Sequence, residues 1–104
     1  PPLNELLGLD DQAFRARFAG TPIKRTGRDR FLRNVLIDAG NARDEALLPD
    51  VIRLLDDASP MVRAMAVWAL ASIAPEAQVR SEAARRRPLE SDPDVLEEWS
   101  EALV

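Results

Sequence analysis

Residues 57–70 decide the fold, and they read Asp57-Ala58-Ser59-Pro60-Met61-Val62-Arg63-Ala64-Met65-Ala66-Val67-Trp68-Ala69-Leu70. A Ser followed by Pro is typical of a helix start, because the Ser side chain caps the first turn and Pro loses no hydrogen bond there. Apolar side chains then recur at helical spacing, which predicts a buried stripe formed by Val62, Ala66, Ala69, Leu70 and Ile73. The stretch therefore predicts a helix that begins at Pro60.

The opening signal of this helix recurs 33 residues further on. This offset pairs Pro60 with Pro93, Val62 with Val95 and Leu70 with Leu103, and backwards it pairs Arg63 with Arg30. Self-similarity at such a period, with one helix pair in each unit, indicates an α-solenoid. The physical reason is that a single helix pair cannot bury its apolar side, so each pair covers the next.

Turn residues divide the rest of the chain into further helices. We expect a short helical turn over residues 3–9, a helix that begins at 10 or 11 and ends at Gly20, a basic loop over 21–27, and helices over 28–39, 43–57, 76–87 and from 93 onward. Gly40 is interpreted as part of a helix stop, and Pro49 either lies inside the helix over 43–57 or starts its main part. No stretch alternates with period two, so no sheet is expected.

A motif in the central unit resembles the HEAT-like repeat, and its residues are Asp57, Pro60, Val62, Arg63, Ala66 and Leu70. The resemblance implies that the Asp and the Arg of the motif form hydrogen bonds between repeats. The predicted fold class is all-α, a right-handed α-solenoid of about three HEAT-like helix pairs. We expect one compact domain, in which residues 1–27 form an N-terminal docking segment with a short helix and the basic loop, and residues 28–104 form the repeats.

Two residue types that carry much enzyme chemistry are missing, since the 104 residues include no Cys and no His. Their absence excludes disulfides, thiolate metal sites, cysteine nucleophiles and His-based acid–base catalysis. The longest apolar run, over residues 64–74, is 11 residues long, which is shorter than the ~20 residues that a membrane-spanning helix needs. We therefore expect no catalytic, metal or cofactor site in this chain, no membrane partner, and a cytoplasmic location.

The basic residues concentrate in one segment of a chain whose net charge is −4. Residues 15–33 carry seven Lys or Arg and one Asp, whereas residues 1–14 sum to −3 and residues 34–104 to −7. Such a concentrated segment can bind a polyanion even on an acidic protein. The candidate RNA-binding residues are Lys24, Arg25, Arg28, Arg30 and Arg33.

Part of this segment resembles the C-terminal region of epoxyqueuosine reductase. The resemblance is carried by Ala19-Gly20-Thr21-Pro22-Ile23-Lys24-Arg25, Arg28, Arg30-Phe31-Leu32-Arg33-Asn34-Val35 and Ala39-Gly40-Asn41. It implies a parent oxidoreductase that reduces epoxyqueuosine to queuosine in tRNA, with a cobalamin and two 4Fe–4S clusters bound by domains that this chain lacks. It also implies that the chain is a non-catalytic fragment that contacts those missing N-terminal domains, and that residues 21–33 help to hold the anticodon region of the tRNA.

Several alternatives stay open on the residues alone. The basic segment is also consistent with a surface that docks against the missing domains, or with an ordinary solvated face. The chain as a whole is also consistent with a HEAT-like protein-interaction scaffold that has no nucleic-acid role. Trp68 and Trp99 are interpreted as core anchors rather than base-stacking platforms, Arg85-Arg86-Arg87 as charges that favour a helix C-terminus, and the acids between Asp92 and Glu101 as a solvated end face.

Overall fold

The computed structural model describes residues 2–8 and 25–104, with the backbone alone described for residues 25 and 26. The helix expected before Gly20 and the first part of the basic loop lie outside the described residues. The helices are α1 (Leu3–Leu7), α3 (Arg25–Ala42), α4 (Leu48–Leu54), α5 (Pro60–Ile73), α6 (Glu76–Arg86) and α7 (Pro93–Ala102), with 3₁₀ turns at Glu45–Leu47 and Arg87–Leu89. No strand occurs within these described ranges, and the all-α class is confirmed. The right-handed solenoid and the division at residue 27 stay predictions.

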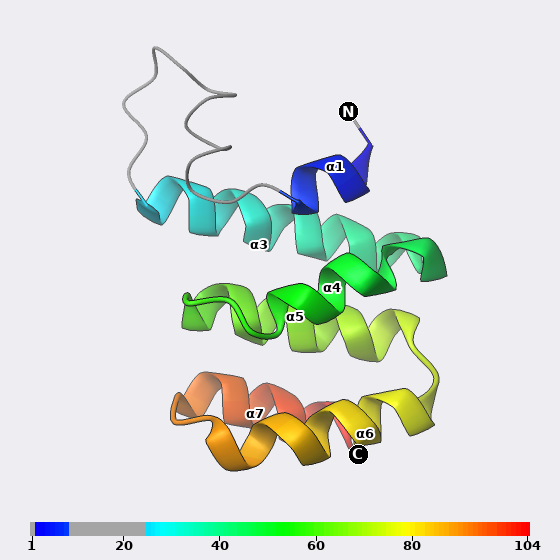
Figure 1. The fold of residues 1–104 in the computed structure, drawn as a ribbon, viewed down its shortest axis with the longest axis vertical. Coiled ribbons are helices and arrows are strands. Elements are labelled where there is room, and N and C mark those ends of the chain that lie inside the picture. The colour runs from blue at the N-terminus through cyan, green and yellow to red at the C-terminus, as the bar shows by residue number, and fades with distance from the viewer. Residues whose placement is uncertain (1, 9–24) are drawn as a thin grey trace.

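The helices lie in two layers (Figure 1). One layer consists of α3, α5 and α7, and α5 packs against both of its neighbours in this layer. Helices α4 and α6 form the second layer and pack on α5, while α1 contacts both α3 and α4. Helix α5 is therefore the central element, which explains why its sequence is the most apolar in the chain.

The expected apolar stripe of α5 forms the centre of the core. All five of its predicted positions are buried: Val62, Ala66, Ala69, Leu70 and Ile73. In α7, Val95 and Trp99 are each 1% exposed, so the interpretation of Trp99 as a core anchor is confirmed. Burial of side chains this large removes enough apolar surface from water to hold the two layers together.

The predicted helix starts are also confirmed. The Ser59 Oγ accepts a hydrogen bond from the Val62 N–H at 3.4 Å, and an Asp92 oxygen accepts from the Val95 N–H at 3.1 Å. Pro49 lies in the first turn of α4, which confirms the interpretation that it starts the main part of that helix. Each of these signals is local, so the sequence alone is enough to find it.

Helix α3 differs from the prediction at both ends. It begins at Arg25 rather than Arg28 and continues to Ala42, so the loop over 25–27 and the stop at Gly40 are both wrong. The residue that leaves the helix in a left-handed conformation is Arg43, with φ 52. Packing along α5 stabilises this longer helix, because tertiary contact outweighs the roughly 1 kcal/mol that each Gly costs inside a helix.

Gly40 has a packing role instead. A Cβ added at Gly40 would overlap the six-membered ring of Trp68, at 2.9 Å from Cη2 and closer still to Cζ3. The ring therefore lies directly on the backbone of α3, and only a residue without a side chain fits between them. This contact brings α3 and α5 close together along one edge of their layer.

We expect the substitution Gly40→Ala to lower the free energy of unfolding by about 1–3 kcal/mol, because the added methyl group displaces the Trp68 ring. Urea denaturation measures the change. Gly8→Ala is the matched control, since a Cβ there meets the Asn4 and Glu5 carbonyl oxygens at 3.5 Å, an ordinary contact distance. Equal stability of the two variants would contradict the proposed role of Gly40.

Candidate nucleic-acid interface

Arg28, one of the five candidate RNA-binding residues, is buried in an ion pair. Its Nη1 and Nη2 donate to the two carboxylate oxygens of Asp57 at 3.0 and 2.7 Å. The Arg28 and Asp57 side chains are each 9% exposed. The same Asp57 carboxylate accepts the backbone N–H of Ser59 at 2.9 Å. Arg28 thus fastens α3 to the turn that starts α5, and it does not present its charge to solvent.

Arg63 repeats this arrangement one helix pair later. Its Nε and Nη2 donate to the two carboxylate oxygens of Glu90 at 2.9 and 3.0 Å, and its Nη1 donates to the Asp57 carbonyl at 2.8 Å. The hydrogen bond from Arg63 is the main reason that the pKa of Glu90 lies below its ordinary value. We call the four residues Arg28, Asp57, Arg63 and Glu90 the arginine–carboxylate ladder.

The ladder confirms that Asp57 and Arg63 form hydrogen bonds between repeats. In the first helix pair, however, the equivalent of Arg63 is Arg28 and not Arg30, which the offset of 33 residues pairs with it. Leu96 stands at the corresponding place in α7, so the last pair has no arginine there. The offset of 33 residues does not identify the equivalent arginine of the first helix pair, because the turns between the helix pairs differ in length. The position of the ion pair is set instead by how the helices stack.

Arg30 and Arg33 lie on the outer side of α3. Both are exposed, and their spacing of three residues places them on the same side of the helix. Within the part of the chain that the structure describes, no carboxylate lies within ion-pair distance of either, and Arg33 donates only to the Asn34 side chain at 3.4 Å. Phe31, between them in sequence, is half-buried against the core. Lys24 lies outside the described residues, and Arg25 starts α3 with its side chain undescribed.

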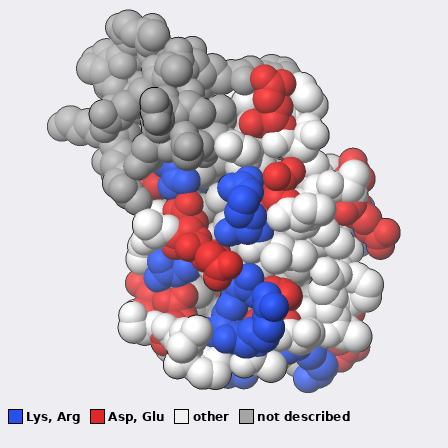
Figure 2. Space-filling view, viewed as in Figure 1, with Lys and Arg blue, Asp and Glu red and all other residues white. Residues whose placement is uncertain are grey.

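Most other arginines are neutralised by acids. Arg53, Arg80 and Arg85 each pair with an acid three or four residues away, and Arg86 pairs with Glu82 and Asp56. Figure 2 shows the result on the face formed by α4 and α6, where basic and acidic side chains alternate and form no continuous basic patch. Arg87, directly after α6, is likewise exposed and has no ion pair among the described residues, so what distinguishes α3 is two unpaired arginines on one side of the same helix.

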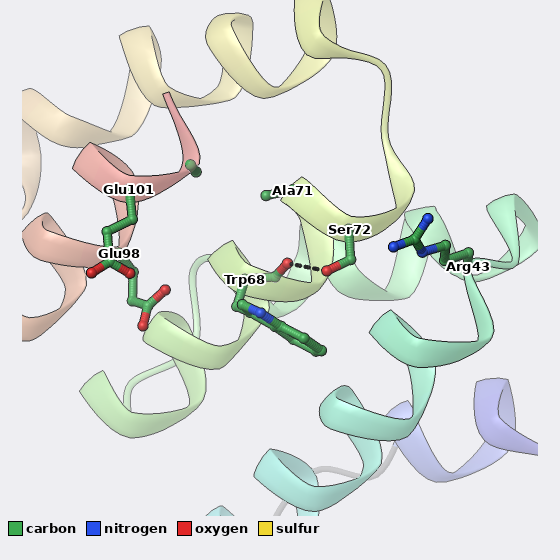
Figure 3. Close-up of a pocket in the computed structure, with 7 residues that line it drawn as sticks. Arg43, Trp68, Ala71, Ser72, Glu98 and Glu101 are labelled. Atoms are coloured by element: carbon green, nitrogen blue, oxygen red, sulfur yellow. Dashed lines mark hydrogen bonds between the residues drawn. The ribbon is translucent and has the colours of Figure 1, made fainter. Parts of the chain in front are cut away.

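A groove of about 370 Å³ lies on the α3–α5–α7 layer. It is lined by Arg43, Trp68, Ala71, Ser72, Glu98, Glu101 and Ala102, and Figure 3 shows the two glutamates on one side of Trp68 and Arg43 on the other. Trp68 is half-buried, so it is both a packing residue on Gly40 and a wall of the groove. Burial is the main cause that raises the pKa of Glu98, and the charges of Glu101 and Glu97 add to it.

Sequence reasoning misses this groove. From the sequence, the acids are interpreted only as a solvated end face, and Arg43 has no role. A usable signal is the spacing of Glu98 and Glu101, which places both on one side of the last helix. Their place in the same groove as Trp68 depends on the packing of α7 against α5, and no local pattern reveals it.

The described residues offer neither a metal site nor a membrane helix. In residues 2–8 and 25–104, no group of three or more metal-ligating side chains is close enough to hold an ion. None of the described helices is both long and apolar enough to cross a membrane.

The chain is similar to known proteins in sequence and in fold. The HEAT repeat family matches residues 47–77. The epoxyqueuosine reductase of Xanthomonas campestris is 38% identical over 73 residues, which cover 66% of this chain and 20% of that protein. The epoxyqueuosine reductase of Listeria monocytogenes is 31% identical over 96 residues, which cover 91% of this chain and 24% of that protein. This chain thus spans between a fifth and a quarter of the length of these curated relatives.

A solved structure supports the same resemblance at the level of the fold. A crystal structure of epoxyqueuosine reductase with an epoxyqueuosine-modified tRNA-Tyr stem loop superposes with a TM-score of 0.85. The match covers 99% of this chain and 28% of that chain, at 24% sequence identity. Together with the sequence relatives, this confirms the resemblance to epoxyqueuosine reductase and the HEAT repeat.

We expect Arg28→Ala to lower the free energy of unfolding by about 3 kcal/mol, because it removes the guanidinium that pairs with the almost buried Asp57 carboxylate. Arg30→Ala is the matched control, since it removes the same charge from the exposed side of the same helix and should change stability by less than about 0.5 kcal/mol. Thermal and urea denaturation of both variants measure the difference. If Arg30→Ala lowered the stability as much as Arg28→Ala, the ion pair with Asp57 would not be the reason that Arg28 stabilises the fold.

Proposed function

We propose that this chain is the HEAT-repeat part of an epoxyqueuosine reductase and that it positions the anticodon region of a tRNA through the exposed side of α3. It carries out no chemistry of its own in this proposal. The observation that carries it is the pair of exposed arginines, Arg30 and Arg33, which have no carboxylate partner among the described residues. In a chain of net charge −4, unpaired arginines on one helix are the feature that suits a polyanion.

The proposed contact set differs from the five candidate residues of the sequence. Arg30 and Arg33 contact phosphate or sugar groups, and Lys24 and Arg25 extend the set at the N-terminal end of α3. The backbone N–H groups of that helix end favour an anion at the same place. Arg28 acts indirectly, because its ion pair with Asp57 holds α3 in position. Such contacts give affinity and orientation without reading the base sequence.

The rest of the enzyme lies outside this chain in our proposal. The cobalamin and the two 4Fe–4S clusters would be held by other domains of the parent protein. The segment over residues 1–27 would contact those domains, while residues 28–104 form a right-handed solenoid. A cytoplasmic location follows from a tRNA substrate.

The alternative function is a protein-interaction scaffold, and one observation favours it. The groove beside Trp68 carries two carboxylates, Glu98 and Glu101, which suit a cationic partner rather than RNA. Neither Arg30 nor Arg33 lines this groove, so the two candidate contacts use different side chains.

The proposal is tested by the binding of an anticodon stem-loop across a salt series. We expect Arg30→Ala/Arg33→Ala to weaken binding and to reduce the slope of log affinity against log salt, by about 0.7–0.9 for each phosphate that the variant no longer neutralises. Fluorescence anisotropy with a labelled stem-loop measures both quantities.

The matched control is Arg80→Ala/Arg85→Ala, which removes the same charge from α6. These arginines are also exposed, at 57% and 64% of their side-chain surface, and pair only with neighbouring acids. This control variant should leave the slope of log affinity against log salt unchanged. If the two double variants weakened binding equally, the effect would be due to net charge and not to the position of the arginines. If neither variant changed binding, α3 would not be the RNA contact surface.

A further inference from the structure

The groove beside Trp68 has a chemistry that the proposed RNA contact does not use. Glu98 and Glu101 come from α7, Trp68 and Ser72 come from α5, and Arg43 follows the end of α3. In Figure 3 the two glutamates lie together on one side of Trp68, and Arg43 lies on the opposite side. Three elements that are far apart in sequence thus meet around one indole ring.

The acids of this groove have no cation beside them. Elsewhere in the described ranges some carboxylates pair with arginine, as Asp56, Asp57, Glu76, Glu82 and Glu90 do, while others such as Asp38 and Asp44 do not. No such pair reaches Glu97, Glu98 or Glu101 within the same ranges. Burial of Glu98 and the charges of Glu101 and Glu97 also raise the pKa of Glu98. A positive charge placed between these carboxylates would relieve both their repulsion and their lost hydration.

The indole of Trp68 supplies the second half of a cation site. The ring lies against Gly40, and the Ser72 hydroxyl donates to the Trp68 carbonyl at 3.0 Å, so the residue is held before any ligand arrives. An aromatic face attracts a cation within about 6 Å of its centre. Carboxylates add charge-assisted hydrogen bonds, which are bidentate when the cation is a guanidinium.

We propose that this groove binds an arginine side chain from a basic segment of a separate partner protein. The guanidinium lies over the Trp68 ring and donates to Glu98 and Glu101. A phosphate or carboxylate ligand is disfavoured at this end, because two negative charges already face it. Arg43 on the other side repels a second cation and attracts an acidic group of the same segment, which fixes the direction in which the segment lies.

The size of the groove agrees with one side chain and its adjoining backbone. Its volume of about 370 Å³ is at the low end of the roughly 300–1,000 Å³ that ligand sites occupy. None of the residues that line the groove belongs to the proposed RNA contact set, so variants of the groove leave those side chains in place.

The test uses the full 104-residue chain and a Gly-Arg-Gly-Arg-Gly peptide as the probe. The side-chain N–H of Trp68 is followed by NMR during titration, with Trp68→Phe used to assign its signal. We expect a saturable shift of the Trp68 signal and no shift of Trp99, which is 1% exposed. A Gly-Glu-Gly-Glu-Gly peptide and a short oligouridylate should leave Trp68 unchanged.

Two variants distinguish specific binding in this groove from a general attraction of the cationic peptide to the acidic side chains of the protein. Glu98→Gln/Glu101→Gln should weaken binding of the arginine peptide about tenfold, because each charge-assisted bond that is removed costs a large part of the affinity. Glu97→Gln is the control, since it removes charge from the same helix outside the groove lining and should change affinity less than about twofold. Thermal unfolding of each variant checks that the fold is retained.

Several outcomes would overturn the proposal. One is an equal effect of Glu97→Gln and the double variant, which would make the attraction non-specific. Another is a Trp68 shift with oligouridylate that matches or exceeds the shift with the arginine peptide, which would reassign the groove to RNA. Failure of the arginine peptide to shift Trp68 at all would also reject it.

Discussion

The ion pair between Arg28 and Asp57 is the interaction on which the arrangement of the first repeats depends. It joins the start of α3 to the turn before α5 by two hydrogen bonds of 3.0 and 2.7 Å, and Arg63 with Glu90 joins α5 to the turn before α7 in the same way. Because both members of the first pair are almost buried, removing Arg28 takes the guanidinium away from a carboxylate that is shielded from water. With α3 held by Arg28, the neighbouring Arg30 and Arg33 must point away from the core, so one ion pair sets which arginines can meet a ligand.

Local signals explain which parts of the fold are predictable from the sequence. Ser59 with Pro60 and Asp92 with Pro93 mark helix starts through caps that involve only the next few residues, and both predictions are confirmed. The ends of α3 cannot be found in this way. Gly40 has the local appearance of a helix stop, yet it lies inside the helix because the Trp68 ring, 28 positions later, needs the space of its missing side chain.

The candidate site is predictable in outline and not in detail. Composition alone locates the basic segment, since residues 15–33 carry seven of the 14 Lys and Arg residues and only one acid. Composition cannot separate Arg28 from Arg30, because the difference is a carboxylate 29 residues away in sequence. The groove beside Trp68 is beyond sequence reasoning for the same reason, since its lining residues follow the end of α3 or belong to α5 and α7, which meet only after the helices stack.

The most direct test of this account observes each arginine separately while RNA binds. Arginine Nε–H signals of the labelled protein are followed by NMR as an anticodon stem-loop is added, with single Arg→Lys variants for assignment. If the exposed side of α3 contacts the RNA, the signals of Arg30 and Arg33 shift with it. Those of Arg28 and Arg63 keep their positions, because Arg28 is buried and the Arg63 Nε–H stays bonded to Glu90. A shift of Arg28 with no change at Arg30 and Arg33 would contradict it, because the ladder would then be the RNA contact and not the support behind it.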